Sequence, residues 1–124
     1  MNLSIVIPVF NEEKTLLEIL NRTNILKKYC NLEIIVVDDG SKDKSKEILQ
    51  NNYELYSECL YLDNNFGKGK AVIEGIKKCS FDYILVQDAD LEYDPRDIIM
   101  FIDEIKIHNY DLIMGSRFIG NKRT

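Results

Sequence analysis

Short apolar runs separated by amphipathic and polar segments are the main pattern along this chain. Short, mainly apolar runs that are rich in β-branched residues are typical of strands buried on both faces of a sheet. Runs of this kind lie at 3–9, 32–37, 59–62, 83–86 and 111–114. Segments with helical character lie between them, and strands that alternate with helices form βαβ units. We therefore predict an α/β fold with a mainly parallel sheet and helices on both faces.

Helices are expected at four places, most clearly after the first strand, where apolar residues recur at a spacing of three to four. The four places are 11–28, 44–52, a segment that follows the loop at 63–70, and a segment from 95 onward. Asn11 is the predicted N-cap of the first helix. Asp94 followed by Pro95 is a typical start for the fourth helix. Gly75 falls in the third, where its small size indicates that the helix approaches the sheet closely.

Length and composition are those of one soluble globular domain, which we assign to residues 1–124. Hydrophobic residues make up 45% of the chain and charged residues 30%. The net charge of -5 argues against a nucleic acid as partner, because nucleic acid binding needs a basic face. The longest uninterrupted apolar run, 98–102, is too short to cross a membrane. We expect a cytoplasmic protein without an integral membrane segment, peripheral to a membrane if it contacts one.

An acidic segment follows the apolar run at 83–86 and carries the strongest chemical signal. Asp88, Asp90, Glu92 and Asp94 stand at alternate positions before a proline. On an extended backbone Asp88 and Asp90 project to the same side, and so do Glu92 and Asp94 if the extension continues. Carboxylates without neighbouring histidine or cysteine suit Mg²⁺ or Mn²⁺. The alternative is a solvated acidic loop that leads into a helix.

Polar segments follow four of the predicted strands. They lie at 8–12, 38–41, 88–92 and 115–117. In parallel α/β sheets, ligands bind beyond the carboxyl ends of the strands. We therefore expect these four segments to converge on one crevice.

A Gly-Lys-Gly-Lys segment at 67–70 lies at the start of the third predicted helix. Its backbone N–H groups and its lysines are suited to binding phosphate. Its spacing is not that of a P-loop, and no G-x-G-x-x-G motif follows the first strand. The segment is therefore either a phosphate-binding turn or an ordinary turn from loop to helix.

Five motifs occur in the order seen in family-2 glycosyltransferases with the GT-A fold. They are Ile-Pro-Val-Phe-Asn-Glu at 7–12, Val-Val-Asp-Asp-Gly-Ser-Lys-Asp at 36–43, Gly-Lys-Gly-Lys-Ala at 67–71, Gln-Asp-Ala-Asp-Leu-Glu at 87–92, and Gly-Ser-Arg-Phe at 115–118. The chain most resembles the branch of dolichol-phosphate mannose synthases and polyprenyl-phosphate glycosyltransferases. The resemblance implies a Rossmann-like fold shortened at its C-terminus, a UDP- or GDP-sugar donor, Mn²⁺ or Mg²⁺, transfer with inversion, and an acceptor such as a lipid phosphate.

The same resemblance assigns roles to individual residues. Asp90 and Glu92 would bind the metal, although many relatives carry glutamine in place of Glu92. Asp88, Asp90 and Arg117 would take part in catalysis, with Arg117 at a phosphate of donor or acceptor. The residues that would bind the nucleotide sugar are Pro8, Val9, Asn11, Glu12, Asp38, Asp39, Gly40, Gly67, Lys68, Gly69, Lys70, Asp88 and Ala89.

Two other functions are open at this point. The first is a non-catalytic module that binds a nucleotide or nucleotide sugar, that is, a donor half without its chemistry. The second is a phospho-acceptor signalling domain, although its acid pair would be expected after the first strand. Relatives continue past the Gly-Ser-Arg motif, so we expect a homodimer or a partner chain to cover the edge of the fourth strand.

Overall fold

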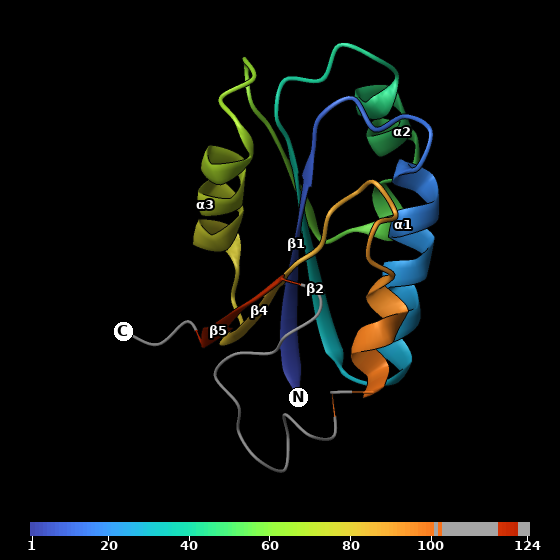
Figure 1. Ribbon diagram of the computed structural model, residues 1–124, viewed down its shortest axis with the longest axis vertical. Helices are drawn as coiled ribbons and strands as arrows, with labels where there is room; N and C mark the ends of the chain where they lie inside the picture. The colour runs from blue at the N-terminus through green and yellow to red at the C-terminus, as the bar shows by residue number, and fades with distance from the viewer. Residues whose placement is uncertain (101, 103–116, 122–124) are drawn as a thin grey trace.

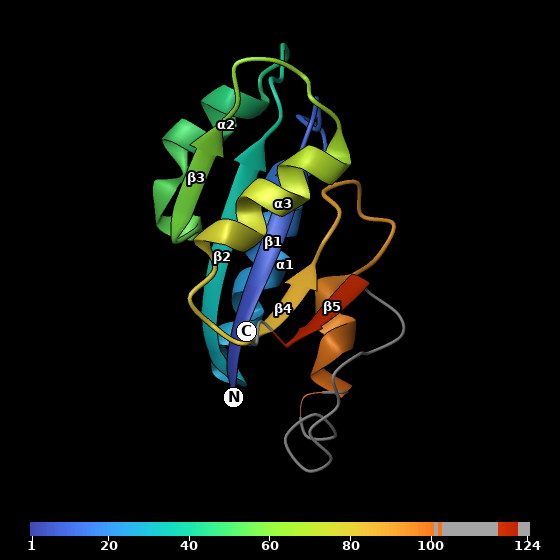
Figure 2. The same cartoon turned by 90° about the vertical axis from the view of Figure 1, so that its left-hand side faces the viewer.

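One sheet runs through the centre of the computed structural model (Figure 1), which describes residues 1–100, 102 and, for the backbone, 117–121. The described part contains five strands in the order β3-β2-β1-β4-β5. The first four are parallel, and β5 is antiparallel to β4 (Figure 2). The elements are β1 (Asn2–Val9), α1 (Leu16–Asn24), η1 (Ile25–Lys28), β2 (Asn31–Asp38), α2 (Ser45–Asn51), η2 (Tyr53–Leu55), β3 (Glu58–Tyr61), α3 (Lys68–Lys78), β4 (Tyr83–Val86), η3 (Pro95–Ile98) and β5 (Arg117–Asn121).

Helices cover both faces of the sheet, with α1 and α2 on one face and α3 on the other (Figure 1). Because successive side chains of a strand point to opposite faces, β1 contributes to two cores. Ile5 and Ile7 pack in the core with α1, whereas Val6 packs in the core with α3. All three side chains are fully buried. This burial on both faces explains the near-continuous apolar run of the first strand.

Close packing of α3 on the sheet depends on Gly75. A Cβ atom added at this position would lie 2.5 Å from Cγ1 of Val6 and 3.1 Å from Cγ2 of Val37. The close approach predicted from the small residue is therefore confirmed. It fixes the distance between α3 and the two central strands, and so the height at which the first turn of α3 stands above the sheet.

The predicted helix at 11–28 is shorter than expected at its start. Residues 12–15 form a turn, α1 begins at Leu16, and η1 ends at Lys28. Asn11 is not an N-cap, because its backbone has a φ of 53° and its side chain binds elsewhere. Its Oδ1 accepts hydrogen bonds from the backbone N–H groups of Lys42 and Asp43. These bonds connect the loops after β1 and β2, a tertiary contact that overrides the local capping preference.

Arg117 was expected in a polar loop, but it is the first residue of the last described strand, β5. The strand predicted at 111–114 lies outside the described residues. Arg117 opens β5 and pairs with Val86 at the carboxyl end of β4, with a register shift between Ile84 and Leu85. Residues 117–121 of the same chain thus pair with the edge of β4, and a partner chain that covers this region stays a prediction. No helix in the described part is both long and apolar enough to span a bilayer.

Candidate functional site

A cleft of about 290 Å³ opens at the carboxyl ends of β1, β2 and β4. The chain turns to opposite sides of β1 to form β2 and β4, and ligands of open α/β sheets bind at such a switch point. Three of the four polar segments expected at this crevice meet there, joined by the loop before α3, while residues 115 and 116 of the fourth segment lie outside the described residues. The lining residues are Pro8, Val9, Phe10, Glu12, Asp39, Asn65, Lys68, Ala71, Asp88, Ala89 and Asp90.

The loop after β1 is held against the loop after β2 by hydrogen bonds. The backbone N–H of Asn11 donates to Oγ of Ser41 at 2.9 Å, and the backbone N–H of Glu12 donates to Oγ of Ser45 at 2.9 Å. Both serines are buried. Phe10 and Glu12 are consequently presented to the cleft by a fixed backbone.

Asp39 holds the loop that precedes α3. Its two carboxylate oxygens accept hydrogen bonds from the backbone N–H groups of Phe66, at 2.9 Å, and Gly67, at 3.0 Å. The neighbouring Gly40 has a φ of 73°, and a Cβ atom there would lie 2.6 Å from the carbonyl carbon of Asn64. Glycine is needed at that position for both reasons. Asp39 and Gly40 therefore dock the loop that brings Lys68 to the cleft.

The loop after β4 turns at Leu91, so Glu92 and Asp94 do not continue the row of carboxylates, whereas Asp88 and Asp90 both line the cleft. Leu91 has a φ of 66°, and Oδ1 of Asp90 accepts a hydrogen bond from the backbone N–H of Glu92 at 3.0 Å. The buried Gln87 closes the loop, because its Nε2 donates to the carbonyl oxygen of Tyr93. Asp94 is directed to Arg96 and caps η3, as predicted from the Asp-Pro pair.

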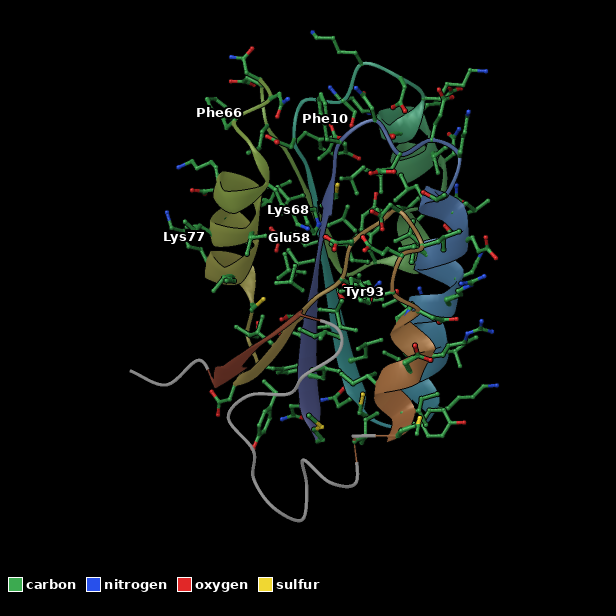
Figure 3. The ribbon with its side chains drawn as sticks, in the orientation of Figure 1. Phe10, Glu58, Phe66, Lys68, Lys77 and Tyr93 are labelled. Atoms are coloured by element: carbon green, nitrogen blue, oxygen red, sulfur yellow. The ribbon has the colours of Figure 1, made fainter. Side chains whose placement is uncertain are left out.

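Acidic side chains from different loops approach one another in the cleft. Burial raises the pKa of the Glu12 carboxyl above its ordinary value of 4.5, and the charges of Asp90, Asp43 and Asp88 raise it further. Asp88 is 8% exposed and forms an ion pair with Lys68. Figure 3 shows Lys68 directed from the first turn of α3 toward the central strands, whereas Lys77 points away from the sheet.

The residues of the cleft fit a divalent cation that is held by one or two carboxylates together with phosphate oxygens of a ligand. In the described part of the chain, no three carboxylate, histidine or cysteine side chains form a ready-made metal cluster. Mg²⁺ is usually held by one or two carboxylates together with substrate phosphates rather than by a cage of protein ligands. Asp90 is exposed and lines the cleft, so it can supply such a carboxylate. Glu92 is exposed outside the lining.

Several of the predicted site residues with described side chains do not line the cleft. Asp38 is fully buried, and one of its carboxylate oxygens accepts a hydrogen bond from the backbone N–H of Ser41 at 3.3 Å. Lys70 forms an ion pair with Glu74 on α3. The backbone of Arg117 pairs with that of Val86 at the carboxyl end of β4. Among the predicted residues whose side chains the structure describes, those outside the lining are Asn11, Asp38, Gly40, Gly67, Gly69, Lys70 and Glu92.

Three lining residues, Phe10, Asn65 and Ala71, were not among the expected site residues. Phe10 is 39% exposed although it is a large aromatic residue directly after a buried strand. An aromatic residue within a polar turn is the signal that points to it in the sequence. Asn65 and Ala71 carry no comparable signal, because the docked loop and the packing of α3 bring them to the cleft.

Relatives of known name resemble this chain over most of its length. The chain is 38% identical over 115 residues to an undecaprenyl-phosphate 4-deoxy-4-formamido-L-arabinose transferase of Pseudomonas savastanoi pv. phaseolicola, a match that covers 89% of this chain and 34% of the relative. It is 36% identical over 120 residues to a dolichol-phosphate mannosyltransferase of Pyrococcus furiosus, which covers 96% of this chain and 34% of the relative. The chain thus spans about a third of the length of these relatives.

Solved structures show the same fold. S. aureus TarS 1-349 in complex with UDP-GlcNAc has a TM-score of 0.75 and 26% identity, with coverage of 90% of this chain and 33% of that chain. The glucosyl-3-phosphoglycerate synthase of Mycobacterium tuberculosis with Mn²⁺, UDP and glucosyl-3-phosphoglycerate has a TM-score of 0.67 at 21% identity, with coverage of 84% and 39%. The predicted GT-A architecture is confirmed by these likenesses.

The model of one sequence family matches nearly the whole chain. This model, Glycosyl transferase family 2, matches residues 4–124, which include all five motifs. The match agrees with the names of the relatives and with the fold of the solved structures. The chain belongs to glycosyl transferase family 2.

Proposed function

We propose that this chain binds the donor in a metal-dependent glycosyltransferase that moves a sugar, with inversion, from a nucleotide sugar to an acceptor phosphate such as a polyprenyl phosphate. The observation that carries the proposal is the cleft at the switch point, where acidic side chains and one lysine meet in a member of this family. The names of the relatives support a polyprenyl or dolichyl phosphate as acceptor.

The nucleotide would occupy the part of the cleft between the loop after β1 and the loop before α3. Phe10 offers a partly exposed ring there for contact with a base. Lys68 lies at the first position of α3, where its ammonium group and the helix N-terminus both favour an anionic diphosphate. The bound UDP and UDP-GlcNAc of the structural neighbours support a ligand of this class.

Asp90 would hold a Mn²⁺ or Mg²⁺ ion together with oxygen atoms of the diphosphate. Bound there, the ion would supply positive charge that stabilises the leaving nucleoside diphosphate. The Mn²⁺ named with two structural neighbours supports this choice of metal. Asp88 lies beside this position at the carboxyl end of β4 and would face the nucleotide.

Transfer would proceed by one displacement. An oxygen of the acceptor phosphate forms a bond to the anomeric carbon while the bond from that carbon to the donor diphosphate breaks, and the nucleoside diphosphate leaves with the electron pair. The acceptor phosphate is already ionised at neutral pH, so no side chain has to remove a proton. Arg117, whose backbone pairs with Val86 at the carboxyl end of β4, would contact one of these phosphates.

Isothermal titration of the full chain with UDP, GDP and their sugars, with and without Mn²⁺, tests the donor site. We expect one nucleotide to bind more tightly when Mn²⁺ is present, and we expect Asp90→Ala to lose that dependence. Asp97→Ala is the control, because Asp97 is an exposed acid outside the lining and has no role assigned to it. Absence of nucleotide binding under all conditions would contradict the proposal.

Transfer itself needs a second assay. The chain is incubated with the radiolabelled sugar nucleotide that binds and with a polyprenyl phosphate, and labelled lipid is measured after extraction. Formation of labelled lipid supports a transferase. Nucleotide binding without any labelled product would instead support the non-catalytic binding module.

A further inference from the structure

One ammonium group stands among the carboxylates of the cleft. The lining residues that the structure describes include four carboxylates, those of Glu12, Asp39, Asp88 and Asp90, and a single lysine, Lys68. Lys68 forms an ion pair with Asp88, whose side chain is 9% exposed, while 41% of the lysine side chain is exposed. The ammonium thus neutralises one of four carboxylates that line the same cleft and repel one another.

The backbone that carries Lys68 is held from two directions. Asp39 binds the backbone N–H of Gly67, directly before Lys68, at 3.0 Å. Behind it, α3 is packed on β1 through the close contact of Gly75 with Val6. The start of the helix is therefore fixed over the cleft, and the flexible part is the lysine side chain.

Lys70 has the same charge two positions further along but different surroundings. Its ammonium group pairs with Glu74 at 3.0 Å, one turn along the outer surface of α3. Its side chain is 51% exposed, and it does not line the cleft. A comparison of the two lysines therefore separates the local effect of a cation in the cleft from the effect of net charge.

We propose that Lys68 makes metal binding depend on the nucleotide. Without nucleotide, the Lys68 ammonium lies beside Asp88 and repels a divalent cation from the neighbouring carboxylates. When a nucleoside diphosphate enters, the ammonium turns to its phosphate oxygens, and the cation binds to Asp90 and the diphosphate together. Lys68 is thus a positioning residue that prevents the acidic cleft from binding a divalent cation before the donor arrives. This inference rests on the proposed function of the same cleft.

The test measures Mn²⁺ affinity by the loss of the free-ion electron paramagnetic resonance signal, with and without saturating UDP or GDP, whichever binds. The ratio of the two affinities is the coupling between metal and nucleotide. In Lys68→Met we expect Mn²⁺ alone to bind about tenfold more tightly, since a repulsive charge is removed, and the coupling to fall by about tenfold. Lys70→Met should leave both values unchanged, and Lys68→Arg should keep most of the coupling.

Thermal unfolding of each variant, followed by circular dichroism, verifies that all are folded under the binding conditions. Unchanged Mn²⁺ affinity and coupling in Lys68→Met would overturn the inference while leaving the proposed function intact. An equal gain in Mn²⁺ affinity in Lys70→Met would also overturn it, because net charge alone would then explain the effect. Failure of the wild-type chain to bind any nucleoside diphosphate would instead overturn the proposed function.

Discussion

Replacing Gly75 with alanine tests the packing that sets the height of α3 above the sheet. The new Cβ would lie 2.5 Å from Cγ1 of Val6 and 3.1 Å from Cγ2 of Val37. Both valines are fully buried, and β-branched side chains have few alternative rotamers. Overpacking of this kind costs about 1–3 kcal/mol. The higher helix propensity of alanine offsets up to about 1 kcal/mol of this loss in the free energy of unfolding. We expect a net loss of roughly 1–2 kcal/mol.

Gly69→Ala is the matched control on the same helix. A Cβ atom at Gly69 meets no atom within 4 Å, so only the gain in helix propensity applies. We expect this variant to be as stable as the wild type or more stable by up to about 1 kcal/mol. Urea unfolding followed by circular dichroism measures both variants, and the slope with urea should be unchanged.

The reasoning would be refuted if Gly75→Ala unfolded at the same urea concentration as the wild type. It would also be refuted if both variants lost the same stability, because the loss would then come from the helix and not from its contact with β1 and β2. A shifted α3 also moves Lys68, which lies at the other end of the helix, so Gly75→Ala should weaken nucleotide binding as well.

Three other changes address the loops around the cleft. Asp90→Ala should abolish the Mn²⁺ dependence of nucleotide binding in titration calorimetry and change stability by less than about 0.5 kcal/mol, because the side chain is exposed. Asp39→Ala should cost about 3 kcal/mol by loss of two charge-assisted hydrogen bonds. Faster hydrogen exchange at the Phe66 and Gly67 amides checks this, and unchanged exchange would contradict it. The hydrogen bond from Arg96 holds the pKa of Asp94 below its ordinary value of 3.8. Asp94 therefore stabilises the fold above about pH 4, and this contribution is lost as the pH falls through the lowered pKa. Asp94→Asn should reduce the loss of stability in urea unfolding below that pH, and an unchanged acid dependence would contradict the assignment.

Local patterns in the sequence determined the elements whose stability comes from simple burial. The strand predicted at 83–86 is observed at Tyr83–Val86, and the helix predicted at 44–52 is observed at Ser45–Asn51. Runs of apolar residues and capping residues act on neighbours in the chain, so they can be read without the fold. The five motifs likewise identified the family, because their order and spacing are properties of the sequence.

Contacts between distant parts of the chain decided the rest. Asn11 carries a good N-cap side chain, but it binds backbone groups about thirty residues away, and α1 therefore begins later. The acids after β4 alternate in sequence, yet a turn at Leu91 separates them. Asp88 pairs with Lys68 at the first position of α3, twenty residues earlier in the chain. Hydrogen bonds and ion pairs of this kind depend on which loops the packed sheet brings together, and no local pattern contains that information.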